Sequence, residues 1–310
     1  MKNRLAGVAA ALVAGLVLTA CGGGADPLAG DSGGSGASGA AAGPIRIGSA
    51  NFPENVLLAQ IYGQALTARG VGVEVLPPIQ SREAYFPGIR DGSIDLVPEY
   101  TGVLLQFLEP SAPQKAPDEV YAALQEAMPE GLEVLERSAA ENKDAVVVTQ
   151  AFAQENGLST IADLAPLCPQ IAFGGPPEFQ ERPDGIPGLE ATYGCTFREY
   201  VSLDVGGPLT VAALENGDVQ AADLFTTDPT IEANGFVALA DPRNNFAAQN
   251  VVPLIRGEKA TDEVRQVLDE ISATLTTQEL LDLNARLGSE TRPNPDVVAR
   301  QWLQDKGLLE

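Results

Sequence analysis

Hydrophobic and polar positions along the first folded stretch alternate between the period of a strand and the period of a helix. Residues 45–49 read Ile-Arg-Ile-Gly-Ser, with the two-residue alternation and β-branched bias of a strand. A helical run of apolar residues then begins at Pro53 and ends at Gly70. The predicted elements that follow are a strand at 71–76, a short helix at 82–91 and a strand at 94–97. Strands that alternate with helices predict a parallel sheet covered by helices, and therefore an α/β fold.

The same alternation resumes in the middle of the chain, and three helical stretches close it. Further strands are predicted at 132–137, 145–149, 170–173, 197–203, 219–222 and 251–255. Helices are predicted at 161–164, 209–214, 261–274, 277–286 and 295–304. Ligands of open α/β sheets bind beyond the carboxyl ends of strands. The segments in which we expect a site are therefore the turns 49–55, 98–102, 174–185 and 225–229.

The first twenty residues have another pattern. A charged start is followed by an apolar stretch at 5–20 that is too short and too rich in Ala and Gly to span a bilayer comfortably. The stretch ends in Leu-Thr-Ala-Cys at 18–21, which resembles a bacterial lipobox, in which the cysteine thiol is acylated. We expect residues 1–20 to be a lipoprotein signal peptide and Cys21 to anchor the protein to the extracytoplasmic face of the cell membrane. An ordinary signal peptide before a chance cysteine is the alternative.

The residues after Cys21 are almost all Gly, Ala and Ser up to residue 43. Such a segment cannot bury enough apolar surface to fold. We therefore expect residues 21–44 to be a flexible tether that holds a folded domain away from the membrane.

Composition excludes several classes of function. The chain has no histidine, which removes the commonest general base and metal ligand and excludes Ser-His-Asp and Cys-His catalysis. A carboxylate-pair enzyme is the remaining catalytic alternative, but no such pair stands out in the sequence. The formal net charge of −23 argues against a nucleic-acid partner. We expect no enzyme, no metal and no cofactor.

Two cysteines remain beyond the tether, Cys168 and Cys195. Outside the cytoplasm such a pair is usually a disulfide. A metal or redox pair is the alternative, which their wide separation and the lack of histidine make less favourable.

Five segments, in order, carry a resemblance to a known family. Residues 95–102, Asp-Leu-Val-Pro-Glu-Tyr-Thr-Gly, are similar to the motif of substrate-binding proteins of osmoprotectant ABC importers, the binders of glycine betaine, choline and carnitine. The opening at 48–55, the central block at 173–194, the late block at 216–228 and Asn-Val-Val-Pro-Leu at 250–254 also resemble that family. The resemblance extends over residues 45–305.

The resemblance implies a two-lobed periplasmic-binding-protein clamshell of type II, each lobe a mixed sheet flanked by helices. Lobe one would be 45–143 plus 250–310, and lobe two would be 144–249. A small-molecule ligand would bind between the lobes, and the closed monomer would deliver it to ABC permease subunits. A ligand sensor without transport is an alternative.

The same motifs nominate ligand-binding residues. Turns at strand ends and helix N-termini expose N–H groups, so Asn55 and Thr101 would suit a carboxylate or hydroxyl. Tyrosines and other aromatics box a quaternary ammonium by cation–π attraction. The full set of candidates is Phe52, Asn55, Tyr100, Thr101, Asn142, Asp144, Glu178, Phe225, Thr226 and Asp228.

Three positions depart from the family pattern. When the motifs are aligned, Val97, Asp144 and Val211 stand where the family has aromatic residues, and Phe225 remains. An aromatic cage that lacks walls at these three positions should bind glycine betaine weakly. We therefore keep two ligand classes open: an osmoprotectant such as glycine betaine, or a more polar, sugar-like or zwitterionic solute that reaches Asp144.

Overall fold

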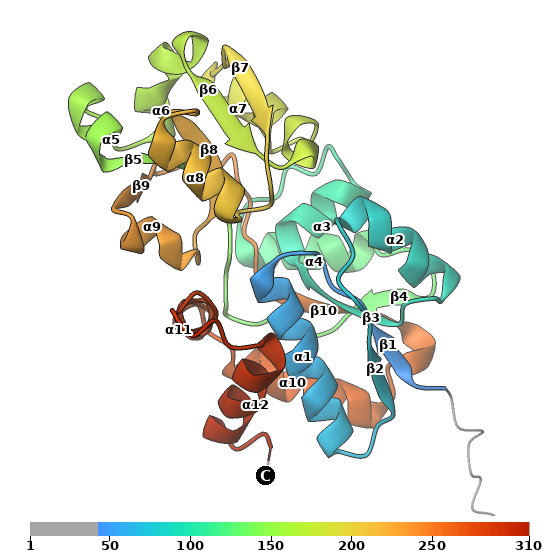
Figure 1. Ribbon diagram of the computed structural model, residues 1–310. Coiled ribbons are helices and arrows are strands. Elements are labelled where there is room, and N and C mark those ends of the chain that lie inside the picture. The colour runs from blue at the N-terminus through green and yellow to red at the C-terminus, as the bar shows by residue number, and fades with distance from the viewer. Residues whose placement is uncertain (1–42, 310) are drawn as a thin grey trace, which may run out of the picture. The chain divides into compact units, whose positions relative to one another are not determined.

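Two five-stranded sheets organise residues 43–309, the part of the chain that the computed structural model describes (Figure 1). The predicted signal peptide, the anchor Cys21 and all but the last two residues of the predicted tether lie outside these residues. Among residues 43–309, no helix is long and apolar enough to cross a membrane.

The first sheet has the strand order β2-β1-β3-β10-β4. Its strands are β1 (Ile45–Ile47), β2 (Val73–Val75), β3 (Leu96–Tyr100), β4 (Leu132–Val134) and β10 (Val251–Arg256). β1 is parallel to both β2 and β3, whereas β10 runs antiparallel to β3 and β4. The sheet is therefore mixed, because β10 returns from the far end of the chain between β3 and β4.

The second sheet repeats this plan with the order β7-β6-β8-β5-β9. Its strands are β5 (Asp144–Thr149), β6 (Ala172–Gly175), β7 (Glu199–Ser202), β8 (Ala221–Phe225) and β9 (Phe236–Ala238). β6 is parallel to β7 and β8, and β5 is antiparallel to β8 and β9. Two mixed sheets confirm the predicted fold class.

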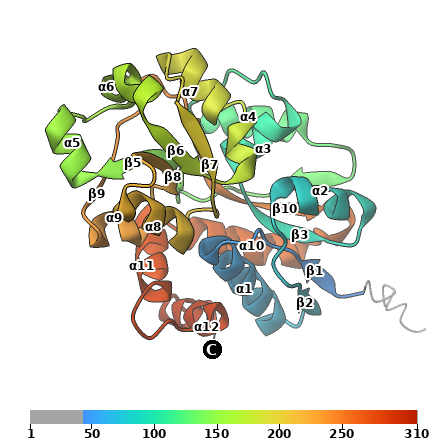
Figure 2. The same cartoon turned by 45° about the horizontal axis from the view of Figure 1, so that its top comes forward.

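Helices cover both faces of the first sheet. One face packs against α1 (Pro53–Ala68), α10 (Asp262–Thr274), α11 (Thr277–Leu287) and α12 (Pro295–Asp305). The other packs against α2 (Arg82–Asp91), α3 (Thr101–Leu108) and α4 (Pro117–Ala127). Figure 2 shows α10 and α12 beside α1, so the C-terminal helices complete the layer that the first helix begins.

The second sheet is covered in the same way. One core joins it to α5 (Gln150–Asn156), α6 (Ile161–Leu164) and α7 (Ile186–Tyr193). The other joins it to α8 (Pro208–Asn216) and α9 (Pro229–Ala233). The first of these cores contains the disulfide Cys168–Cys195, with Cα atoms 5.3 Å apart, which confirms the predicted pairing.

The chain passes between the sheets twice, and the two passages lie side by side. The first follows β4, and the second precedes β10. Asn142 N donates to the Gln249 carbonyl at 3.0 Å, and Val251 N donates to the Ala140 carbonyl at 3.0 Å. We call residues 140–142 and 249–251 the crossing segments. Their pairing makes a short connection between the two sheets that both passages share.

Strands β3 and β8 are longer at their carboxyl ends than the sequence predicts. Pro98 and Tyr100, predicted to belong to a turn, remain in β3 because they pair with Pro253 and Val251 of β10. Phe225 likewise stays in β8 because it pairs with Asp144 of β5. The antiparallel partner comes from a distant part of the chain, so local sequence does not reveal it. These extensions carry Tyr100 and Phe225 to the ends of their sheets.

Candidate functional site

A cavity of about 50 Å³ lies where the two sheets meet. Tyr100 and Phe225, the last residues of β3 and β8, both line it, as do Asn142 and Gln249 of the crossing segments. A second cavity of about 230 Å³ shares Arg82, Val103, Glu178 and Arg182 with the first. Both lobes and both passages between them therefore contribute to the lining of two adjoining cavities.

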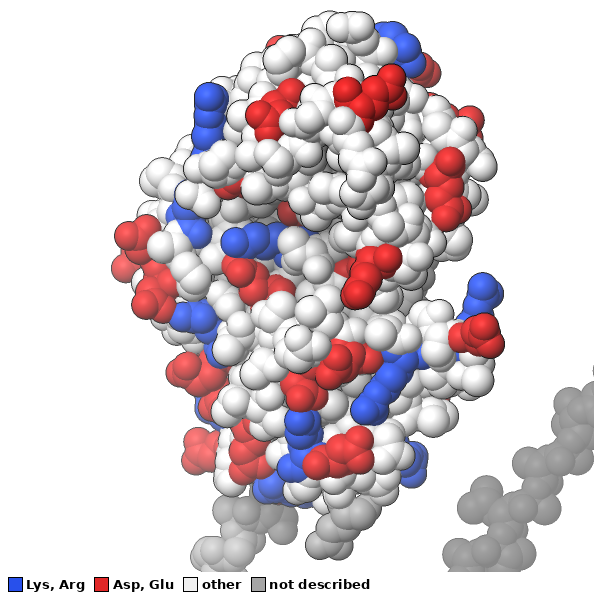
Figure 3. Space-filling model, turned by 90° about the vertical axis from the view of Figure 1, so that its left-hand side faces the viewer, with Lys and Arg blue, Asp and Glu red and all other residues white. Residues whose placement is uncertain are grey.

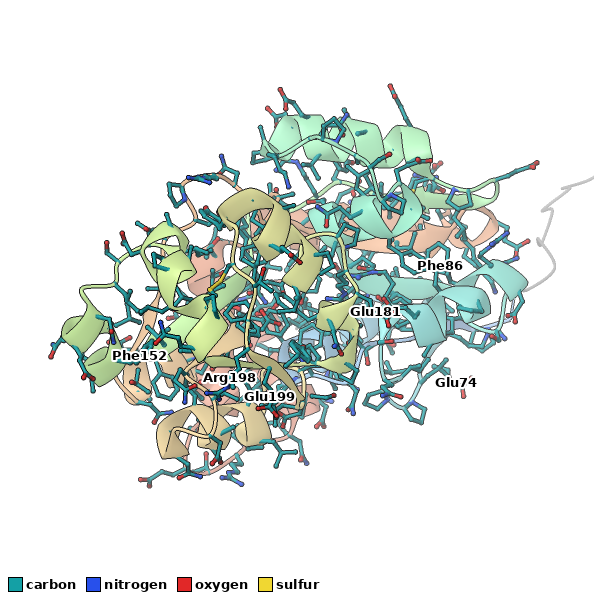
Figure 4. The ribbon with its side chains drawn as sticks, turned by 90° about the horizontal axis from the view of Figure 1, so that it is seen from above. Glu74, Phe86, Phe152, Glu181, Arg198 and Glu199 are labelled. Carbon is teal, nitrogen blue, oxygen red and sulfur yellow. A yellow bond between two sulfur atoms is a disulfide. The ribbon has the colours of Figure 1, made fainter. Side chains whose placement is uncertain are left out.

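The second cavity opens between α2 and the segment before α7. It is lined by Glu83 from α2 and by Glu181 and Asp184 from the other side. Figure 4 shows Glu181 between Phe86, which lies on α2, and Arg198 and Glu199 near β7. Elsewhere, acidic side chains are spread over the face seen in Figure 3 rather than gathered in one patch. Surface charge on that face therefore does not single out a binding site.

An aromatic group crosses the first cavity from one lobe to the other. The Phe52 ring lies 6.1 Å from the Tyr100 ring and 5.3 Å from the Phe225 ring, between ring centroids. Tyr85 also lines the cavity. Aromatic faces attract cations and pack well against methyl groups. The cavity is therefore suited to an ammonium group.

Behind this aromatic group, Arg82 and Glu99 form a buried ion pair. The Arg82 Nε and Nη2 atoms donate to the two carboxylate oxygens at 2.8 and 2.7 Å, and the Tyr85 hydroxyl donates to the same carboxylate at 2.5 Å. Burial lowers the pKa of Arg82, but the Glu99 charge more than offsets this and leaves the pKa above its usual value. Arg82 is therefore charged and already neutralised by Glu99, so it supports the wall of the cavity.

Asp144 faces the cavity from the first position of β5 and is 6% exposed. Burial and, to a lesser extent, the neighbouring Asp184 charge raise the pKa of its carboxyl to about 6, against the effect of Arg182 and Arg82. Arg182 lies 3.9 Å from Glu178, a long ion pair between two residues that both line the cavity. This side of the cavity therefore presents charged groups that the protein pairs only weakly.

Glu54 lies behind the cavity and connects four segments. Its carboxylate accepts hydrogen bonds from Tyr100 Oη at 2.6 Å, Asn142 Nδ2 at 2.8 Å, Thr227 Oγ1 at 2.7 Å and Asn284 Nδ2 at 2.6 Å. A carboxylate has about four lone-pair positions, so these donors use all of them. Glu54 thereby fixes a cavity tyrosine, a crossing segment, the turn after β8 and helix α11 relative to each other.

Two of the residues predicted to bind the ligand through polar atoms use those atoms in hydrogen bonds to the backbone. Asn55 lines the cavity, but its Oδ1 accepts from Ala50 N at 2.7 Å and its Nδ2 donates to the Pro98 carbonyl at 2.9 Å. Thr101 is fully buried away from the cavity, where its hydroxyl donates to the Ala248 carbonyl and accepts from Asn250 N, both at 3.1 Å. Both side chains therefore hold turns and crossing segments together.

Two further candidates lie beyond the cavity wall. The Thr226 hydroxyl accepts from Lys143 N at 2.9 Å, which ties β8 to the start of β5. Asp228 caps α9 through Thr230 N at 2.8 Å. The structure brings the other candidates, Phe52, Asn55, Tyr100, Asn142, Asp144, Glu178 and Phe225, to one cavity.

The positions aligned with the family's aromatic cage give a different result. Val97 is 0% exposed within a core of the first lobe, and Val211 packs against a core of the second. Of the four aligned positions, Phe225 is the aromatic one that lines the cavity. Aromatic residues from other positions, Phe52, Tyr85 and Tyr100, line it together with Phe225.

Sequence reasoning missed several residues that shape the site. Glu54, in the first turn of α1, has the pattern of a helix-dipole charge, and nothing local points to its partners up to 230 residues away. Gln249 has no sequence signal, because it bonds to Val103, 146 residues earlier. Tyr85 follows Arg82 by three positions on α2, so helical spacing alone could have placed both side chains on one face of the helix. Within residues 43–309, no group of three or more His, Cys, Asp or Glu side chains is arranged to hold a metal ion.

Residues 43–305 match the family described as the substrate binding domain of ABC-type glycine betaine transport systems. The glycine betaine-binding protein YehZ of Escherichia coli is 27% identical over 281 residues, which cover 86% of this chain and 92% of that protein. A glycine-betaine-binding protein of Pseudomonas aeruginosa is 28% identical over 280 residues, which cover 86% of this chain and 89% of that protein.

A solved structure described as a glycine betaine/carnitine/choline ABC transporter has the same fold. It superposes with a TM-score of 0.68 at 20% identity and covers 86% of this chain and 100% of that one. At this identity the likeness concerns the arrangement of the two sheets and their helices.

Proposed function

The chain belongs to the family of substrate-binding domains of ABC-type glycine betaine transport systems, and from this premise we propose that it captures a small zwitterionic osmolyte and delivers it to an ABC importer. This is a family of transport proteins and not of enzymes. The observation that carries the proposal is the cavity between the sheets, where Phe52, Tyr100 and Phe225 adjoin Asp144 and Arg182. Aromatic faces and a carboxylate suit a methylated ammonium, and a guanidinium suits a carboxylate.

We propose that closure around the ligand is a movement of two lobes, residues 45–143 plus 250–310 against residues 144–249. The paired crossing segments support this boundary, because they are the short connection that both passages share. Phe52 contacts Phe225 across the boundary, with ring centroids 5.3 Å apart. A ligand that touches both aromatic rings would favour the closed arrangement by its differential affinity.

The proposed setting of this function is the extracytoplasmic face of the cell membrane. Support comes from the lipobox-like sequence before Cys21 and the Gly, Ala and Ser-rich segment after it. In this setting a monomer held by lipid at Cys21 would present the closed form to the permease subunits. Replacement of Cys21 by Ser should release the protein from membranes, and a wild-type protein found wholly in the culture medium would contradict the anchor.

Calorimetry with glycine betaine, its less methylated analogues, carnitine and choline tests the binding function. A ligand at a hundred times its dissociation constant should stabilise the protein by about 2.7 kcal/mol. Phe52→Ala and Phe225→Ala should each weaken binding by roughly tenfold, as the loss of one cation–π wall predicts. Phe152→Ala is the matched control, because Phe152 is also half-buried but packs on the core of the second lobe and does not line the cavity.

Two results would contradict the proposed function. One is the absence of binding by every member of this panel. The other is uptake of the bound ligand that is unchanged when the gene is deleted, since a delivering protein is required for transport. The second result, with binding intact, would identify a ligand sensor instead.

A further inference from the structure

Asn142 has one amide atom that the protein leaves without a partner. Its Nδ2 donates to Glu54 Oε1 at 2.8 Å, whereas its Oδ1 is buried and has no donor among residues 43–309. The orientation of the amide is fixed, because the Glu54 carboxylate accepts and would repel the amide oxygen. Asn142 is 5% exposed and lines the cavity. An unsatisfied acceptor is therefore held at the wall of the binding site.

Gln249, on the neighbouring crossing segment, has an amide donor that the protein leaves without an acceptor. Its Oε1 accepts from Val103 N at 2.9 Å, and its Nε2 is buried without an acceptor among the described residues. The backbone N–H of Val103 fixes this orientation in the same way. Gln249 is 1% exposed and also lines the cavity. The cavity wall therefore offers one unsatisfied donor besides the unsatisfied acceptor.

Asp144 adds a second acceptor two residues beyond Asn142. Within the described part of the chain, no other side chain donates a hydrogen bond to its carboxylate, although the residue is 6% exposed and lines the cavity. In contrast, the Glu54 and Glu99 carboxylates behind the cavity are fully hydrogen-bonded by neighbouring side chains. Buried side-chain atoms without partners also occur on Gln64, Gln114, Asp223 and Asn250, but of all the described residues with such atoms only Asn142 and Gln249 line the first cavity.

Buried polar groups without partners are uncommon, and each one lowers stability by its lost hydration. A binding site can retain them when the ligand supplies the missing partners, and such a site strongly rejects an analogue that lacks them. Glycine betaine has a carboxylate for Gln249, but its nitrogen carries three methyl groups and no N–H for Asn142 or Asp144. The acceptors in this wall would therefore be satisfied by a ligand with an N–H donor, which glycine betaine lacks.

We infer that the ligand of this protein is a compact amino-acid zwitterion whose ammonium nitrogen keeps at least one N–H, which it donates to Asp144 and Asn142 Oδ1. Its carboxylate accepts from Gln249 Nε2, and its N-methyl groups pack against Phe52 and Phe225. The inference rests on the proposed function and names the chemical class that the same cavity selects.

Glycine betaine, N,N-dimethylglycine and sarcosine form a series that tests this inference, because each step exchanges one methyl group for one N–H. Calorimetry on the full chain in mild detergent should show that dimethylglycine binds at least tenfold more tightly than glycine betaine. Tighter binding of glycine betaine would overturn the inference and leave the proposed function intact. No binding by any of the three, nor by carnitine and choline, would overturn the proposed function itself.

Variants assign the preference to particular groups. Asp144→Asn and Asn142→Ala should each reduce the ratio of the two affinities at least fivefold, whereas a merely structural role would lower both affinities together. Asp218→Asn is the matched control, because Asp218 is exposed in the turn before β8, and it should leave the ratio unchanged. An unchanged ratio in both cavity variants would overturn the assignment. The wild-type series decides the inference without any variant, so it stands even if a variant fails to fold.

Discussion

The two walls of the cavity contrast in how their polar groups are used. On the first-lobe wall, Asn55, Arg82 and Tyr100 direct their polar atoms to partners within the protein, at distances from 2.6 to 2.9 Å. On the opposite wall, formed by the crossing segments and the second lobe, Asn142 Oδ1 has no such partner among the described residues. The Asp144 carboxylate, which is 6% exposed, accepts no hydrogen bond from another side chain among the described residues. The first wall is a rigid, pre-formed surface for apolar contact. The second is incomplete until a ligand supplies donors, so we expect changes to the first to affect stability and changes to the second to affect binding.

The largest effect should come from breaking the ion pair that supports the first-lobe wall. Glu99→Ala leaves the buried Arg82 charge without its partner, and loss of one partner of a buried pair costs about 3–5 kcal/mol. Urea denaturation measures this as a loss of unfolding free energy. Glu270→Ala, which breaks the exposed Arg69 pair, is the control and should cost no more than about 1 kcal/mol. Equal losses in the two variants would show that the first wall is not a structural support.

A matched pair of asparagine variants should separate the walls more sharply. Asn55→Ala leaves Ala50 N and the Pro98 carbonyl unpaired, which should cost about 2–3 kcal/mol of unfolding free energy. Asn142→Ala removes one of four donors to Glu54 and should cost about 1 kcal/mol, but it should weaken ligand binding at least tenfold. Denaturation and calorimetry on both variants give the test. If Asn55→Ala impairs binding more than stability, the contrast between the walls is wrong.

A smaller effect should appear as a dependence of binding on pH. Because Asp144 has a pKa of about 6 in the empty protein, protonation competes with a cationic N–H ligand below that pH. Affinity should therefore fall by about tenfold for each pH unit below the pKa, with little change above about pH 7. The Asp184 charge raises the pKa of Asp144, Arg182 and Arg82 lower it, and the Asp144 charge in turn raises the pKa of Asp223, so calorimetry across pH should reveal coupled rather than single-site titration.

The same pKa shift has a consequence for stability with a definite sign. A carboxyl whose pKa is raised on folding destabilises the folded protein progressively as pH rises from about 4 to about 6. Asp144→Asn should remove that slope from the stability of the empty protein. A slope that persists unchanged in Asp144→Asn would mean that Asp184 or Asp223, whose pKa values burial also raises, is responsible.

The sequence predicts the alternation of strands and helices, and the cysteine pairing, because both follow from local pattern and compartment. It also brings Phe52, Tyr100 and Phe225 forward, since they lie at the ends of predicted strands or at a helix start. It does not reveal that the backbone uses the polar atoms of Asn55 and Thr101, whose positions at turns suit a ligand.

What the sequence does not contain is the long-range pairing that decides which polar groups remain available. Asn142 Oδ1 has no hydrogen-bond partner among the described residues, because the amide is oriented by the bond from its Nδ2 to Glu54, 88 residues earlier. Gln249 Nε2 has no hydrogen-bond partner among the described residues, because the amide is oriented by the bond that its Oε1 accepts from Val103 N, 146 residues earlier. Neither relation has a local signature. Which polar atoms of the crossing segments are left free to bind a ligand is therefore decided by contacts between distant parts of the folded chain.

A crystal structure of the complex with N,N-dimethylglycine tests most directly whether the ligand donates to Asp144 and Asn142. We expect the ligand nitrogen to lie within hydrogen-bond distance, about 3 Å, of an Asp144 oxygen or of Asn142 Oδ1. We also expect the ligand carboxylate to lie at a similar distance from Gln249 Nε2 and the methyl groups to face Phe52 and Phe225. A ligand nitrogen enclosed by aromatic rings, with Asn142 and Asp144 still unpaired, would contradict this expectation.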